Sequence, residues 1–248
     1  MFHMAPGGVY VRQGGQPAHP FAYQLLPSIV DHRHKMAAYA GIQVYQGNQW
    51  PAEHVGTILC GNIHDNAVHQ DSLAANGATF KSSFKQDFIR ANDGWFMPVS
   101  QQIGPDGALW IMDWYDKYPC YQNARADPDG IDREHGRIWR VTAKGRPLQT
   151  APKIAGEPIP QLLDLLKSSD YRTRYTAKLE LRERDPQQVK VALSQWLAKL
   201  DARDPRHFRR EAVELVDHRV DGVLELEDLA LDVDGDLPGE VAARDRRR

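Results

Sequence analysis

The stretch GPDGALWIMDWYD, residues 104–116, carries a turn signal, a strand pattern and then a group of acids and aromatics. The Asp-Gly pair in GPDG suits backbone angles that other residues resist, so we expect a tight turn there. The run ALWIMDW (108–114) is short, apolar and aromatic, which is typical of a strand. Asp113 and Asp116 mark the point where this strand ends. They either cap the backbone at the end of the strand or belong to a functional site located there.

The same alternation of short apolar runs and turn signals extends over residues 1–145. Short β-branched and aromatic runs between Gly-containing turns predict antiparallel strands. We therefore predict that this part of the chain is mainly β. The expected strands are GIQVY (41–45), GTILCGNI (56–63), AVHQDSL (67–73), TFKSSF (79–84), MPVSQQI (97–103), ALWIMDW (108–114) and RIWRV (137–141).

The composition changes after this β-rich part. Residues 146–160 contain Pro and Gly without periodicity and predict a linker. Residues 161–220 show apolar side chains at helical spacing, with Asp170 and Asp185 placed as helix N-caps. Short helices of this kind indicate an all-α region of stacked antiparallel pairs, as in HEAT-like arrays. Residues 221–248 alternate Leu and Val with acids and predict a poorly ordered tail.

The bulk composition excludes several classes of protein. A formal net charge of −2 points neither to nucleic acid nor to an anionic membrane as a partner. No apolar run approaches the roughly 18 residues of a membrane span, and no signal peptide opens the chain. Cys60 and Cys120 are the only cysteines, so CxxC zinc and CxxCH haem motifs are both missing. The two are either buried thiols or partners in one disulfide.

Strand direction predicts where the polar residues gather. If consecutive strands alternate in direction, the connections after every second strand meet at one rim of the sheets. Loops held by rigid sheets are where binding and catalysis concentrate, so we expect a functional site at this rim. The clusters expected there are His32/Arg33/His34, His64/Asp65/Asn66, Arg90/Asn92/Asp93, and Asp113/Tyr115/Asp116 with Arg133/Glu134/His135.

The histidines at this rim suggest two kinds of chemistry. His64, flanked by Asp65, is the best candidate for a base, because a carboxylate can fix the tautomer of an imidazole and raise its basicity. The alternative is a histidine that satisfies backbone groups in a tight turn. His32 and His34, two residues apart, can bind a transition metal or an anion. The alternative for them is a pair of solvated or cation-stacked rings.

The acids and aromatics at the end of the 108–114 strand suggest ligand binding. Asp113 and Asp116 offer oxygen ligands to a hard cation such as Ca²⁺, and the alternative is that they cap backbone N–H groups. Trp114 and Tyr115 lie where a sugar ring can stack, and the alternative for both is packing. The remaining tryptophans of the β-rich part, Trp95 among them, are expected in the core or between sheets.

Four-stranded units with tight lower turns and functional upper loops resemble the blades of a β-propeller. VYQGNQWPAEHVGTILCGNIHDNAVHQDSL, DFIRANDGWFMPVSQQIGPDGALWIMDWYD and DREHGRIWRV are similar to the closing blades of a bacterial membrane-bound dehydrogenase family of planctomycete type. That family is related to soluble quinoprotein glucose/sorbosone dehydrogenases. LLDLLKSSDYRTRYTAKLELRERDP is similar to the start of the HEAT-like helices that follow its propeller.

This resemblance implies about two blades of a six-bladed-type β-propeller in residues 1–145, and a chain that is a fragment, inactive alone. It implies a periplasmic or other extracytoplasmic dehydrogenase that oxidises sugar-like alcohols, with a c-type cytochrome domain as partner. Such a reaction needs a base and a hydride acceptor, here pyrroloquinoline quinone with Ca²⁺. On this hypothesis His64 and Asp65 are catalytic, Asp113 and Asp116 bind the metal, and Arg133, His135, Trp114 and Tyr115 bind the cofactor. Pairing of Arg133 and His135 with neighbouring acids is the alternative.

A second class of function fits the same sequence. Propellers and HEAT-type arrays both recognise proteins or glycans without chemistry, so the chain is alternatively a non-catalytic binding module. Reduction of a redox dye with added pyrroloquinoline quinone would favour the enzyme. Capture of a protein partner without dye reduction would favour the module.

Overall fold

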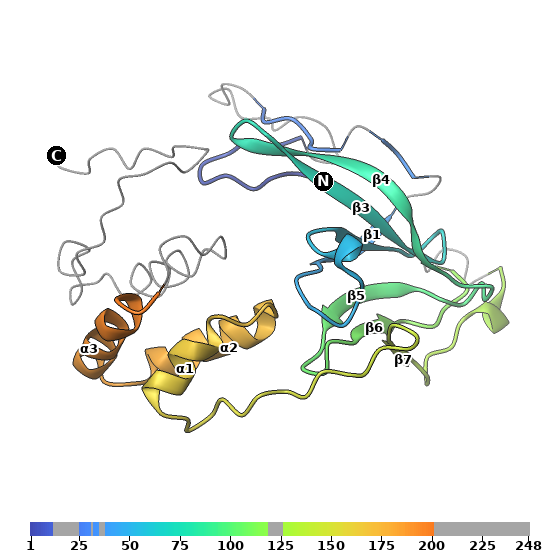
Figure 1. The fold of residues 1–248 in the computed structure, drawn as a ribbon. Helices are drawn as coiled ribbons and strands as arrows, with labels where there is room; N and C mark the ends of the chain where they lie inside the picture. Colours follow the sequence, from blue (N-terminus) through green and yellow to red (C-terminus); the bar gives the residue numbers. More distant parts are fainter. Residues whose placement is uncertain (12–24, 31, 35–37, 119–125, 201–248) are drawn as a thin grey trace.

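The computed structural model describes residues 1–11, 25–30, 32–34, 38–118 and 126–200 (Figure 1). Within these ranges the chain forms two antiparallel sheets followed by α-helices, and Figure 1 shows the helices beside the sheets, reached by an extended stretch of chain. The mainly β character predicted for residues 1–145 is therefore confirmed. Cys120 and the predicted tail lie outside the described residues.

The first sheet contains four strands in sequential order, each antiparallel to its neighbour. They are β1 (Tyr39–Val44), β2 (Ile58–Asn62), β3 (Ala67–Asn76) and β4 (Thr79–Arg90). Gly77 lies in the β3–β4 turn with φ of +61°, a left-handed angle that glycine adopts without steric cost. The predicted strand order is confirmed, and both strands of this hairpin extend further than predicted.

The second sheet contains three strands, also sequential and antiparallel. They are β5 (Pro98–Ile103), β6 (Leu109–Asp113) and β7 (Arg137–Val141). The predicted Asp-Gly turn between the first two is confirmed, with Gly107 at φ of +76°. The quoted stretch of sequence thus forms the turn and the central strand of this sheet.

One apolar layer joins the two sheets. Alternate residues of β6 are buried, so Leu109 and Ile111 face inward while Met112, which is 55% exposed, faces outward. The layer consists of Leu59 and Val68 from the first sheet with Phe96, Leu109 and Ile111. Because this layer fixes the sheets against each other, it also brings the ends of their strands together.

Three helices follow: α1 (Ile159–Leu165), α2 (Tyr171–Arg182) and α3 (Pro186–Leu197). The two predicted N-caps are confirmed. The Asp170 carboxylate accepts the Thr173 N–H at 2.7 Å, and the Asp185 carboxylate accepts the Gln188 N–H at 3.0 Å. These bonds satisfy N–H groups that the first helical turn leaves without partners. No helix among the described residues is long and apolar enough to cross a membrane.

The helices share a core of their own. Its fully or nearly buried members are Leu162, Leu163, Leu166, Ala177, Leu181, Val189, Leu193, Trp196 and Leu197. α1 begins at Ile159, inside the predicted linker. Pro158 is its N-cap residue, and Pro160 lies in the first turn, where proline is tolerated. The helical part contacts the β1–β2 connection, where the Tyr171 N–H donates to the Gln46 carbonyl at 2.9 Å.

Candidate functional site

Three of the four predicted polar clusters lie at one rim of the sheets. The Asn66 side chain donates to the carbonyls of Phe96 at 2.7 Å and Gly94 at 3.3 Å, which joins the β2–β3 turn to the approach of β5. The Trp114 N–H donates to the Met97 carbonyl at 3.0 Å, which brings the end of β6 to the same place. The predicted alternation of strand direction is correct for these connections.

An ion-pair network occupies one side of this rim. Arg90 at the end of β4 lies 2.9 Å from the Asp65 carboxylate and 2.7 Å from Asp87. Asp87 also accepts a hydrogen bond from the buried His69 ring at 2.7 Å. The hydrogen bond from Arg90 holds the pKa of Asp65 below its usual value. Burial raises the pKa of Asp87, but hydrogen bonds from His69 and Arg90 outweigh it and the net direction is downward.

The structure does not pair the two residues proposed as a catalytic dyad. The Asp65 carboxylate faces Arg90, with the Nε2 of His69 as a further neighbour at 3.7 Å. The His64 backbone N–H donates to the Asn62 side chain at 3.1 Å, and the half-buried His64 ring has no hydrogen-bond partner among the described residues. Asp65 therefore does not orient the His64 ring. His64 does lie in the β2–β3 turn, as the alternative expected, but its ring satisfies no backbone group among the described residues.

The buried Asp113 carboxylate accepts hydrogen bonds at both of its oxygens. Its Oδ1 accepts the N–H groups of Met97 at 2.8 Å and Tyr115 at 3.1 Å. Its Oδ2 accepts Arg137 Nε at 2.7 Å and Trp139 Nε1 at 2.8 Å. A carboxylate offers about four lone-pair positions, and all of them are used here.

This arrangement does not fit the proposed Ca²⁺ ligand set. Asp113 has no free lone pair for a cation, and the positive Arg137 side chain lies beside it. Asp116 accepts the Tyr118 N–H at 3.2 Å, which is also a turn-capping role. The geometry therefore agrees with the capping alternative for both acids, and we derive no chemistry through Ca²⁺ at this position.

The two aromatics proposed for cofactor stacking have different surroundings. Tyr115 adopts a left-handed backbone angle, φ of +59°, and its ring packs under the Arg137 guanidinium at 4.1 Å. It also contacts Trp95, with ring centroids 5.1 Å apart. Trp114, at the end of β6, is 62% exposed to solvent. Tyr115 is thus used in packing, whereas Trp114 keeps a ring face open to a ligand.

An open cleft lies between Trp95 and the connection that precedes β7. It has a volume of about 570 Å³ and is lined by Trp95, Pro128, Asp129, Ile131, Asp132, Arg133 and Glu134. Of the two residues proposed to hold a quinone, Arg133 lines the cleft, as expected for a binding residue. His135 does not line it and instead pairs with Asp132 at 2.8 Å, which is the alternative left open from the sequence.

Sequence reasoning missed one lining residue of this cleft, Trp95. Trp95 was expected in the core or between sheets, but it is half-buried and forms part of the cleft wall. The available signal was the Asp93-Gly94 turn immediately before it, which places the ring at the rim. The Trp95 N–H donates to the Asp93 carboxylate at 2.9 Å, so this turn positions the aromatic.

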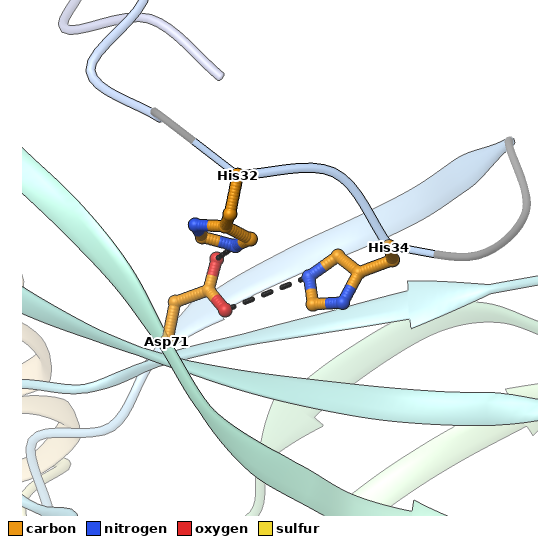
Figure 2. Close-up of side chains that lie close together, drawn as sticks. All are labelled: His32, His34 and Asp71. Atoms are coloured by element: carbon orange, nitrogen blue, oxygen red, sulfur yellow. Dashed lines mark ion pairs between the residues drawn. The ribbon is translucent and has the colours of Figure 1, made fainter.

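The fourth predicted cluster is not at this rim, and that part of the prediction is wrong. His32 and His34 lie over the face of the first sheet, 3.3 Å and 3.6 Å from the Asp71 carboxylate (Figure 2). Asp71 pairs with Ile58, at the opposite end of β2 from the rim. The cause is a non-local bond, in which the Ser82 N–H donates to the carbonyl of Ile29 at 2.7 Å and holds this segment against β4.

The fold and the rim together define a class of protein: a β-rich module whose connecting loops form a polar cleft with an aromatic wall. The chain belongs to the family described as a domain of unknown function (DUF7133), whose model matches residues 8–145. That match spans both sheets. Comparison with curated proteins found no match, and comparison with solved structures found none either.

Proposed function

We propose that the β-rich part is a propeller-type module that binds a sugar-like ligand or a glycan in the rim cleft. The observation that carries this proposal is the cleft wall itself, in which the Trp95 ring adjoins Asp129, Asp132, Arg133 and Glu134. Sugar rings present apolar C–H faces that pack on aromatic rings and hydroxyls that pair with charged side chains. The volume of about 570 Å³ lies within the range of small-ligand sites, roughly 300–1,000 Å³.

The wall that carries Trp95 is held rigidly. The Asp93 carboxylate that accepts the Trp95 N–H also lies 2.6 Å from Arg137 Nη1. Arg137 is in turn bonded to the buried Asp113. A ligand therefore meets a surface that is already in place, and binding loses little entropy in ordering it.

The geometry supports binding better than the dehydrogenase activity that the resemblance implies. Oxidation of an alcohol needs a positioned base, and the proposed partner of His64 is held by Arg90 instead. The proposed metal ligand Asp113 has its acceptor positions filled by protein donors. Two packed antiparallel sheets followed by short helices support the further proposal of propeller blades with a HEAT-like array, and the resemblance supports an extracytoplasmic location.

Calorimetric titration with a panel of mono- and oligosaccharides tests the binding function. Trp95→Ala is expected to weaken binding about tenfold, the value of one aromatic stacking contact. Trp110→Ala is the matched control, because Trp110 lies on the outer face of β6 beside Arg140 and does not line the cleft. Absence of saccharide binding, or equal loss in both variants, would refute the proposal. Dye reduction with added pyrroloquinoline quinone by the wild-type chain would favour the dehydrogenase instead.

A further inference from the structure

Two histidines and one carboxylate converge on the face of the first sheet, away from the rim cleft. We propose that His32, His34 and Asp71 form a binding site for one divalent transition-metal ion, of which Zn²⁺ is the best fit. One ligand atom from each residue lies within 4.8 Å of the others. Figure 2 shows both imidazole rings directed at the carboxylate, one at each of its oxygens.

The distances are those of ligands around a shared ion. His32 Nε2 lies 3.3 Å from Asp71 Oδ2, and His34 Nε2 lies 3.6 Å from Asp71 Oδ1. Metal–ligand bonds of about 2.0–2.2 Å in a tetrahedron place neighbouring ligand atoms about 3.3–3.6 Å apart. Small rotations of the rings therefore bring all three groups to bonding distance of one ion.

The Asp71 carboxylate has an unmet requirement that an ion would satisfy. Its side chain is 5% exposed, and Oδ1 is buried without a hydrogen bond from any residue that the structure describes. Among the described residues, the hydrogen bond that Oδ2 accepts is a long one from Ser82 Oγ, at 3.4 Å. A buried charged oxygen without a donor is costly, and within the described residues the ion-pair partners of Asp71 are these two histidines.

The surrounding residues hold the rings in position. His34 stacks on His69 with centroids 3.8 Å apart and planes 1° from parallel, and Asp87 holds His69 at 2.7 Å. The Phe84 ring packs edge-on against His34, with centroids 4.9 Å apart. The Tyr39 hydroxyl accepts the backbone N–H of His34 at 3.3 Å. Ligands fixed in this way by neighbouring groups are typical of metal centres.

The donor set selects the class of ion. Two imidazole nitrogens with one carboxylate suit Zn²⁺ and related first-row ions, whereas Ca²⁺ and Mg²⁺ prefer oxygen ligands. Three protein ligands leave a fourth position for water or another ligand. The His32 side chain, 19% exposed, gives this position access to solvent. The bound ion would also fasten residues 32–34 to the strand that carries Asp71.

Equilibrium dialysis of the untagged full chain against Zn²⁺, followed by elemental analysis, tests the site. We expect one tightly bound ion per chain, and visible absorption bands of a low-symmetry site when Co²⁺ replaces it. Asp71→Asn, which keeps the size of the side chain, and His34→Ala are each expected to weaken Zn²⁺ binding by about 100-fold. His3→Ala is the control and should bind as the wild type does, because His3 is exposed and contacts Thr79 instead.

A second variant, at the more exposed ligand His32, tests the site without disturbing a buried side chain. His32→Gln alters a partly exposed side chain, and circular dichroism reports whether the sheets persist. Zn²⁺ should raise the melting temperature of the wild type by several degrees and leave that of His32→Gln unchanged. A wild type that takes up no ion, or a folded His32→Gln that binds Zn²⁺ as tightly, would overturn the proposal. Neither result depends on saccharide binding at the rim.

Discussion

The Arg137 guanidinium and the buried Asp113 carboxylate form a hydrogen-bonded ion pair, with Nε 2.7 Å from Oδ2. The two residues are also register partners, Asp113 at the end of β6 and Arg137 at the start of β7. Arg137 reaches from this pair to Asp93, in the turn that carries Trp95. The pair therefore connects the core of the second sheet to the wall of the proposed binding cleft.

Asp113→Ala is expected to lower the free energy of unfolding by about 3–5 kcal/mol, the cost of breaking a buried ion pair from one side. The substitution leaves Arg137 Nε and the Met97 N–H without their acceptor, although Arg137 Nη1 keeps its ion pair with Asp93. His64→Ala is the matched rim control and should change stability by less than about 1 kcal/mol. Urea unfolding measures both. An Asp113→Ala protein as stable as the wild type would contradict the structural role.

Acidification should destabilise the network around Arg90. Because the pKa of Asp65 in the folded protein lies below its ordinary value of 3.8, the carboxylate stabilises the fold fully above that pH. This contribution is lost as the pH falls through the lower pKa of the folded state. Arg90→Gln removes the largest cause of the shift, so its unfolding free energy should decline less between pH 5 and pH 2.

Chemical denaturation at a series of pH values provides the measurement for this prediction. Lys144→Gln removes a positive charge from an exposed residue that has no ion pair among the described residues, and it serves as the control. It should keep the acid dependence of the wild type. If Arg90→Gln and the wild type lose stability in parallel, the ion pair does not carry the pH dependence.

Two glycines with similar backbone angles should respond differently to alanine. Gly77 has φ of +61° and open space where a Cβ would be added, so Gly77→Ala should cost about 1–2 kcal/mol. Gly107 has φ of +76°, and an added Cβ would lie 2.7 Å from the Cβ of buried Gln49. Gly107→Ala should cost about 1–3 kcal/mol more, from overpacking. Thermal unfolding compares the two, and equal losses would show that Gln49 moves aside freely.

Local features of the fold were predictable from the sequence alone. The turn at Gly107, the strand that follows it and the caps at Asp170 and Asp185 all appear where the residue pattern placed them. Each depends on neighbouring residues only: a glycine's backbone freedom, side-chain alternation, or a carboxylate two or three residues from an N–H. The shared rim for three clusters followed from strand direction, which antiparallel pairing makes regular.

Partner choice at the candidate sites was not predictable in the same way. Asp65 was expected beside His64, its sequence neighbour, but it pairs with Arg90, 25 positions away. Asp113 was expected to hold a cation, but its lone pairs are filled by donors from Met97, which precedes β5, from β7 and from its own loop. Charged side chains are long, and several partners lie within reach once the sheets pack. Burial and geometry then decide among them.

The sequence by itself determined which segments become strands, turns and helices, because backbone propensity and side-chain periodicity act over a few residues. Only the tertiary structure decided that His32 and His34 meet Asp71 instead of the rim, and that Trp95 lines a cleft. Those placements depend on contacts between segments far apart in the chain, such as Ser82 with Ile29. Such contacts are set by the packing of whole sheets. That packing depends on many segments at once and cannot be inferred from any single stretch of residues.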